Sequence, residues 1–205
     1  MSNKAFTRSH LKEFLRLFGA PVSKYGKGIA KTLEDLYLSI ACGEIRVSLY
    51  AVPLSTGFML VPLLTCRKVK IDIYCMIDGV LWYLVEGEQL LENGNRRRRS
   101  EKRSASEKIG KGESLFVAAR RCMMEELGLV FTPTTEPELF LYKKYFAKPR
   151  PSNSFPGTYV NGRRHKVVVQ LHPDLFNPEG YTEYKDGKPR THFSWKRAHD
   201  VWAMT

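Results

Sequence analysis

The spacing of the apolar residues changes at Gly43, and this change constrains the fold more than any other feature of the sequence. Within 32–42, apolar residues recur at helical spacing behind a Thr32/Asp35 pair that resembles a capping box. From 45 to 49 they alternate with polar residues, as in a strand with one buried face. The sequence therefore predicts a helical N-terminal segment followed by a sheet.

Further strand patterns follow along the chain. Residues 69–73 alternate in the same way. Asp78-Gly79 lies between two apolar runs, and this pair predicts a tight hairpin because both turn positions must accept positive φ. Strand-like runs also occupy 138–146 and 166–171.

These patterns predict an α/β or α+β fold in which a mixed, curved sheet extends from about 44 to 175. A helix over 114–127 is expected to pack on one face, and 192–202 are expected to form a last short amphipathic helix. At 205 residues the chain is long enough for one well-buried core. We expect a main domain over 44–205 and an N-terminal helical extension over 1–43.

The N-terminal extension admits three interpretations. It is basic and amphipathic, with Ser9 as the expected helix cap and Gly19 as the stop. The apolar residues that share its helical face are Leu11, Phe14, Leu15 and Phe18. The first interpretation is an organellar targeting peptide, for example a mitochondrial one. The second is a helix that docks on the protein core, and the third is a helix that docks on a partner. We favour docking on the core.

The formal net charge of +12 is concentrated in two segments. Residues 1–31 hold seven Lys and Arg against one Glu, and 96–112 hold eight against two Glu. The second segment belongs to a predicted basic loop at about 87–112. Its candidate phosphate-binding residues are Arg96, Arg97, Arg98, Arg99, Lys102 and Arg103.

RNA or another polyanion would gain free energy from counterion release on such a segment, and arginine can hold a phosphate through two hydrogen bonds. The alternative is a solvated loop, or a nuclear-localisation-like stretch, with no specific ligand.

The cysteines and the apolar runs bear on the compartment. The four cysteines lack the paired spacing of a zinc site and lie among apolar neighbours, which favours reduced thiols. No run approaches about 18 apolar residues, so we expect no membrane span. We therefore expect a soluble, intracellular protein in a reducing compartment, either cytoplasmic or organellar.

The candidate chemical site lies in residues 107–131, EKIGKGESLFVAARRCMMEELGLVF. Ser114 is a plausible cap for a helix that runs to Leu127 and stops at Gly128. The helix follows a glycine-containing loop, and its C-terminal end carries two adjacent acids.

Carboxylates at this place suggest a cation site. Glu113, Glu125 and Glu126 offer the oxygen ligands that Mg²⁺ prefers, and Arg121 lies one turn before Glu125, where the two side chains can pair. The alternative is that the acids form a solvated helix face.

The stretch resembles the Nudix box, whose pattern is Gly, five residues, Glu, seven residues, then Arg-Glu-apolar-x-Glu-Glu-x-Gly-apolar. The residues that fall on this pattern are Glu113, Arg121, Met123, Glu125, Glu126, Gly128 and Leu129. The segments SEKIGKGE and PSNSFPGTYV also resemble parts of uncharacterised eukaryotic Nudix-like proteins.

The resemblance implies an α/β/α sandwich in which the box forms a loop, a helix and a second loop. It implies that the glutamates hold Mg²⁺ or Mn²⁺ against the pyrophosphate of a nucleoside diphosphate linked to another group. On that basis Glu113, Arg121, Glu125 and Glu126 are the catalytic residues of an active enzyme, with the three glutamates as metal ligands.

Two positions depart from the pattern. Glu107 stands in place of the Gly, and Cys122 stands in place of the Glu that follows the Arg and belongs to the metal-binding set. A neutral thiol supplies neither the charge nor the hard oxygen that Mg²⁺ prefers. We therefore expect weak or absent hydrolase activity and a binding or structural role in an RNA-containing or multi-protein assembly. The alternative is a divergent magnesium-dependent Nudix hydrolase.

Overall fold

The computed structural model describes residues 7–90, 96–98 and 105–203. The chain divides into two compact units. Unit 1 consists of 1–67, 110–112 and 146–163. Unit 2 consists of 68–109, 113–145 and 164–205.

Unit 1 contains two helices and a long hairpin. Its elements are α1 (Arg8–Leu17), the 3-10 turn η1 (Val22–Lys24), α2 (Leu33–Ala41), β1 (Ile45–Leu54) and β2 (Gly57–Cys66). The two strands are antiparallel along their whole length, from Ile45 opposite Cys66 to Leu54 opposite Gly57. The core joins the helices to the base of the hairpin through Leu11, Leu15, Ala20, Leu36, Ile45, Leu64, Cys66 and Phe155.

Both helices of unit 1 begin with capping boxes. The Thr32 hydroxyl accepts from the Asp35 N–H at 3.1 Å, and the Asp35 carboxylate accepts from the Thr32 N–H at 2.8 Å, as predicted. The prediction that Ser9 caps the first helix is wrong. Thr7 is the cap, because its hydroxyl accepts from the His10 N–H while the His10 ring accepts from the Thr7 N–H.

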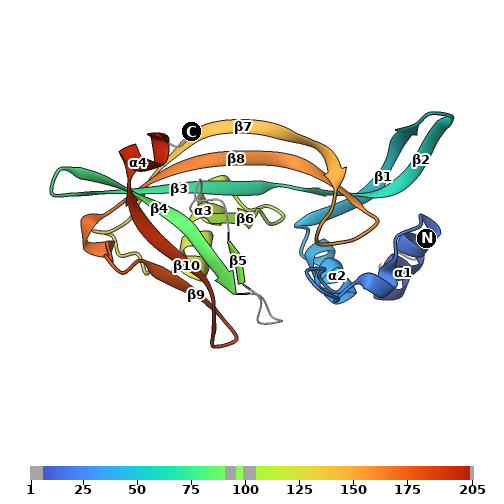
Figure 1. Ribbon diagram of the computed structural model, residues 1–205, viewed down its shortest axis with the longest axis horizontal. Coiled ribbons are helices and arrows are strands. Elements are labelled where there is room, and N and C mark those ends of the chain that lie inside the picture. The colour runs from blue at the N-terminus through green and yellow to red at the C-terminus, as the bar shows by residue number, and fades with distance from the viewer. Residues whose placement is uncertain (1–6, 91–95, 99–104, 204–205) are drawn as a thin grey trace. The chain divides into compact units, whose positions relative to one another are not determined.

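Unit 2 contains a mixed sheet in the strand order β8-β3-β4-β10-β9 (Figure 1). Its strands are β3 (Lys68–Ile77), β4 (Val80–Leu90), β5 (Arg96–Arg98), β6 (Ala105–Lys108), β7 (Glu138–Pro151), β8 (Tyr159–Leu171), β9 (Tyr181–Lys185) and β10 (Lys188–Arg197), and a 3-10 turn, η2 (Pro173–Leu175), follows β8. The β3/β8 pair is parallel, whereas β4 is antiparallel to both β3 and β10. Strands β7 and β8 each contribute residues to both units.

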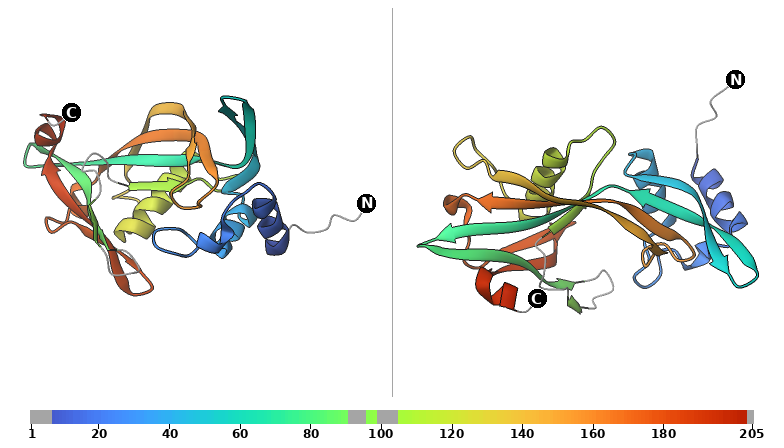
Figure 2. Two further views of the ribbon diagram at one scale, coloured as in Figure 1. Left: turned by 45° about the vertical axis from the view of Figure 1, so that its right-hand side comes forward. Right: turned by 90° about the horizontal axis from the view of Figure 1, so that it is seen from above.

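Helices cover both faces of this sheet. Helix α3 (Leu115–Leu127) packs against buried residues of β3, β4 and β8 in the larger core. Helix α4 (Ala198–Ala203) packs on the alternate residues Tyr83 and Val85 of β4. In the right-hand view of Figure 2 the two helices lie on opposite sides of the strands. The predicted α/β class, the mixed sheet and the position of the 114–127 helix are confirmed.

The Asp78-Gly79 hairpin is also confirmed, with both residues at positive φ. The predicted strands at 138–146 and 166–171 are present and longer than expected. Part of the segment predicted as a basic loop, 87–112, is strand, because β4 continues to Leu90 and β5 and β6 pair with β4 and β3.

The prediction of a helix over 192–202 is wrong for its first half. Residues up to Arg197 belong to β10, where Phe193 is opposite Glu86 and Trp195 is opposite Leu84. Pairing with β4 therefore prevails over the local helical pattern. Within the described ranges, none of the helices combines the length and the apolar character needed to span a bilayer.

Position 180 in unit 2 is expected to require glycine for steric reasons. Its φ is +79°, and a Cβ there would lie 1.9 Å from the Phe193 carbonyl oxygen of β10. Gly180→Ala should lower the free energy of unfolding by about 3 kcal/mol, because it adds a backbone clash to the strain of a positive φ.

Gly187→Ala is the matched control. Its φ is +71°, but nothing lies within 4 Å of the added methyl group. Its expected cost is about 1 kcal/mol, from φ alone. Equal losses for the two variants in urea denaturation would contradict the steric explanation.

Candidate functional site

Helix α3 begins and ends where the sequence indicates. The Ser114 hydroxyl accepts from the Val117 N–H at 3.2 Å, and Gly128 closes the helix in the left-handed conformation with φ 67°. The loop before the helix, the helix itself and the loop after it therefore reproduce the arrangement implied by the Nudix box.

Arg121 is the centre of the polar contacts on this helix. Its guanidinium donates to both carboxylate oxygens of Glu113, at 2.9 and 3.1 Å, and to the Lys108 carbonyl at 2.8 Å. The predicted pair with Glu125 is present at 3.1 Å. The hydrogen bond with Glu113 raises the Arg121 pKa further above its ordinary value, although burial acts in the opposite direction. Arg121 thus ties the preceding loop to the helix.

Glu126 lies in a different electrostatic environment. Burial, followed by repulsion from Glu183, Glu107 and Glu86, raises the pKa of Glu126 to about 8. Without a cation nearby, the surroundings of Glu126 therefore favour the neutral form of its carboxyl.

Cys122 belongs to the hydrophobic core. Its side chain is completely buried among residues of α3 and the sheet. Burial is the main cause that raises its pKa well above the ordinary thiol value, and repulsion from Glu126 acts in the same direction. The position at which the box has a glutamate therefore points away from water.

The three predicted metal ligands do not converge. Glu113 and Glu125 both bind Arg121, whereas Glu126 faces the other acids. Over residues 7–90, 96–98 and 105–203, no three His, Cys, Asp or Glu side chains are grouped closely enough to hold a metal ion. As arranged, these side chains do not fit a three-carboxylate magnesium site.

Sequence reasoning missed two of the acids near Glu126. Glu86 is a nearly buried residue of β4, and Glu183 lies in the unpredicted strand β9, where its carboxylate accepts from the Thr191 hydroxyl at 2.7 Å. Glu86 carried a weak signal, since it directly follows the apolar run 80–85. Glu183 carried none, because its position depends on the pairing of β9 with β10.

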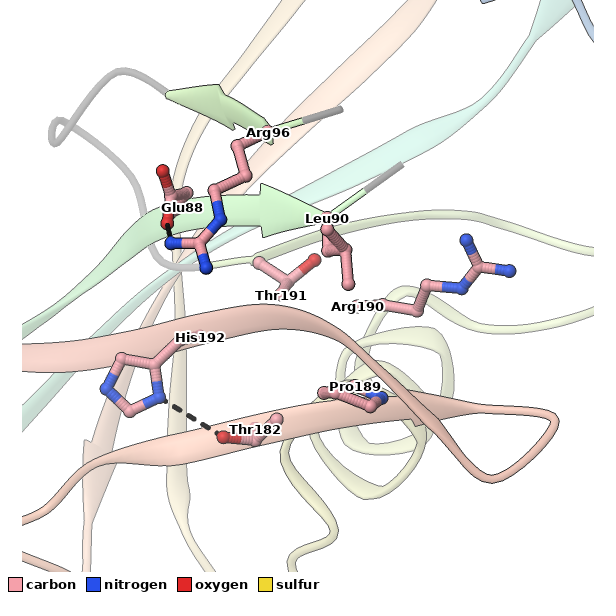
Figure 3. A pocket seen from close by; sticks show the side chains of 8 residues that line it. All are labelled: Glu88, Leu90, Arg96, Thr182, Pro189, Arg190, Thr191 and His192. Carbon is pink, nitrogen blue, oxygen red and sulfur yellow. Dashed lines mark hydrogen bonds and ion pairs between the residues drawn. The ribbon is translucent and has the colours of Figure 1, made fainter. Parts of the chain in front are cut away.

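The basic segment begins beside a small hollow (Figure 3). The hollow encloses about 170 Å³ and is lined by Glu88, Leu90, Arg96, Thr182, Pro189, Arg190, Thr191 and His192. Arg96 donates to Glu88 at 2.9 Å, and the Thr182 hydroxyl shares a hydrogen bond of 3.1 Å with His192 Nδ1. Arg96 is thus held at the start of the arginine run by an exposed ion pair.

The other predicted RNA-binding residues are only partly described. The backbones of Arg97 and Arg98 pair with β4 opposite Gln89 and Glu88. Arg99, Lys102 and Arg103 lie outside the described residues.

Arg121→Met is expected to lower the free energy of unfolding by about 2–3 kcal/mol, because it leaves Glu113, whose side chain is only 14% exposed, without its bidentate partner. Arg120→Met is the control. Arg120 also pairs with a glutamate, Glu136, but the two side chains are 41% and 47% exposed, so the loss should stay below about 1 kcal/mol. Denaturant unfolding of both variants distinguishes a structural ion pair from a surface one.

Glu126→Gln is expected to stabilise the protein at alkaline pH in metal-free buffer. The folded-state pKa of about 8 lies above the ordinary value of 4.5, so the folded state retains a proton that the unfolded state loses. Relative to the glutamine variant, the wild type therefore loses stability as pH rises from 4.5 through 8, by up to about 5 kcal/mol. Melting temperatures at pH 4.5 and pH 9 measure the difference. Glu125→Gln, which breaks an ion pair instead, should show no such gain.

No protein-family model matches this chain, and no curated protein matches its sequence. Several solved structures are similar to it at low identity. A Caenorhabditis elegans Ap4A hydrolase in a binary complex is 14% identical over 67% of this chain and 83% of its own, with a TM-score of 0.39. A MutT/nudix family protein from Enterococcus faecalis is 16% identical over 86% of this chain and 54% of its own, with a TM-score of 0.37.

A third similar structure is the Trypanosoma brucei MERS1–RNA complex, which is 15% identical over 66% of this chain and 52% of its own, with a TM-score of 0.35. These values are too low to assign an activity or a ligand. The loop, helix and loop of residues 107–131, with α3 packed on a mixed sheet and α4 on its other face, match the arrangement that the resemblance to the Nudix box implies.

Proposed function

We propose that this chain is a binding protein of Nudix-like fold, in which the box stabilises the structure and the basic segment contacts RNA. The observation that carries the first part is the engagement of Arg121 with both Glu113 and Glu125. Two of the three acids expected to hold a metal are thereby used to fasten a loop to a helix.

The buried thiol of Cys122 supports the same conclusion. Hydrolysis of a pyrophosphate by water needs cations held in accurate positions, and losing one ligand commonly removes several kcal/mol of transition-state stabilisation. Here the thiol lies in the core, so the position that carries a glutamate in the box offers no oxygen ligand.

The basic segment supports the RNA-binding part. Arg96 to Lys111 holds eight Lys and Arg against two Glu, so a phosphate chain passing over it would release several counterions. Arg190 and His192 of β10 also line the hollow beside Arg96, and both side chains can donate hydrogen bonds. The Glu88 carboxylate holds Arg96 and competes with phosphate for it.

A second candidate function is divergent metal-dependent hydrolysis. One observation favours it: repulsion from Glu183, Glu107 and Glu86 reaches Glu126, and a divalent cation would relieve this repulsion. Metal sites commonly contain acids that repel one another when the cation is absent. Hydrolysis is therefore tested alongside RNA binding.

The test is a salt titration of fluorescent single-stranded RNA binding. Replacing Arg96 to Arg99 by serine should weaken binding. It should also make the slope of log K against log salt concentration shallower by three or four phosphate contacts, and each contact contributes roughly 0.7 to that slope. The matched control replaces the same four arginines by lysine, which keeps the charge and should preserve most of the slope. Glu88→Gln should strengthen binding slightly, because it releases Arg96.

Two results would contradict this proposal. An unchanged salt slope in the serine variant would show that the arginine run does not contact phosphates. Rapid Mn²⁺-dependent hydrolysis of ADP-ribose, abolished by Glu126→Gln, would place the divergent hydrolase first.

A further inference from the structure

The β1/β2 hairpin of unit 1 extends beyond the core that holds its base. Ile45, Leu64 and Cys66, near the open end, are buried against α1 and α2. Residues 49–60 form the outer part, which rises away from both helices in Figure 1 and in the left-hand view of Figure 2. None of the buried residues of unit 1's core comes from this outer part.

The outer part is apolar on both faces. Cross-strand partners share a face, so Leu49, Leu60 and Phe58 lie on one face and Leu54 and Met59 lie on the other. All five are exposed, from 40% for Leu49 to 69% for Phe58. Exposed apolar side chains gathered at one place indicate an interaction site. A partner that covers this tip must surround it, because both faces need to be removed from water.

The composition of unit 1 indicates what kind of partner fits. From Val47 to Cys66 the sequence contains no charged residue. The remainder of unit 1 is strongly basic: the unit as a whole holds 13 Lys and Arg against 4 Asp and Glu, which is +9 of the chain's +12. An uncharged, apolar projection on a basic body matches an anionic membrane surface, where apolar insertion and attraction to acidic headgroups act together.

Other occupants fit these observations less well. A second copy of the chain would bring two units of charge +9 together, and their repulsion opposes a dimer through this surface. A groove in a partner protein covers mainly one face of a ribbon, whereas the exposed residues occupy both. RNA would contact the basic residues and leave the apolar tip in water.

We propose that the tip of the β1/β2 hairpin, residues 53–60, inserts into the interfacial region of membranes that contain anionic lipids. The insertion is shallow, about 5–10 Å, because the outer edges of an open hairpin keep backbone groups that need water deeper in the bilayer. Between the two strands the backbone groups are already paired, and Pro53 has no N–H to leave unsatisfied. This role is separate from RNA binding and uses a different unit of the chain.

The experiment measures co-sedimentation of the full chain with two kinds of vesicle, one of phosphatidylcholine alone and one that also contains phosphatidylserine. Much more of the wild-type protein should sediment with the anionic vesicles than with the neutral ones. Raising the salt to about 1 M, where the Debye length is about 3 Å, should weaken binding strongly. Phe58→Asp should weaken it at least about tenfold, because the largest exposed apolar side chain of the tip is replaced by a charge.

The matched control is Val130→Asp. Val130 is 73% exposed and belongs to unit 2, so the substitution adds the same charge at an exposed apolar position outside the hairpin. It should bind vesicles nearly as well as the wild type. RNA binding by Phe58→Asp should be unchanged, which separates the two roles.

A second variant tests insertion directly. The tryptophans Trp82, Trp195 and Trp202 all belong to unit 2, so Phe58→Trp adds a reporter at the tip. Its added fluorescence should shift to shorter wavelength with anionic vesicles. Equal vesicle binding by Phe58→Asp and wild type, or no shift of the added tryptophan, would overturn the proposal. So would a wild-type dimer that Phe58→Asp dissociates, since the tip would then be covered by a second copy.

Discussion

The guanidinium of Arg121 holds the loop before α3 to the helix, and the arrangement of the candidate site depends on it. It donates two hydrogen bonds to the Glu113 carboxylate, one to the Glu125 carboxylate one turn later and one to the Lys108 carbonyl at the end of β6. These contacts fix the end of a strand, a glycine-containing loop and the middle of a helix to one side chain. A planar group with five donors suits this task, and lysine could not replace it in the same geometry. The chemistry open to the site then depends on the acids that do not bind Arg121, such as Glu126.

The sequence was most informative where local chemistry determines structure. The caps at Thr32 and Ser114, the stop at Gly128 and the turn at Asp78-Gly79 depend on residues a few positions apart, and all are found. Pairings between distant segments were harder. Strand β9 and the first half of the expected C-terminal helix are determined by pairing with β10 and β4, which no local pattern reveals. The raised pKa of Glu126 depends on the same long-range arrangement, because Glu86 and Glu183 belong to β4 and β9.

The two units carry unequal shares of the formal net charge, and the sequence alone does not show this division. By sequence, the excess of positive charge falls at 1–31 and 96–112. In the structure, unit 1 also gathers basic residues from β7 and β8, such as Lys148 and Arg163, and contains few acids.

The aromatic residues show a similar dependence on the fold. Phe155 is buried in the core of unit 1, whereas Tyr142 is 69% exposed beneath the ammonium group of Lys166.

The complete burial of Cys122 limits what a single substitution at this position can do. A glutamate at this position would not create a metal-binding helix, because the new carboxylate would enter the core beside Glu126, whose own ionisation is already disfavoured. A single Cys122→Glu substitution therefore places an unpaired charge in the core, and its main effect is on folding and not on metal binding.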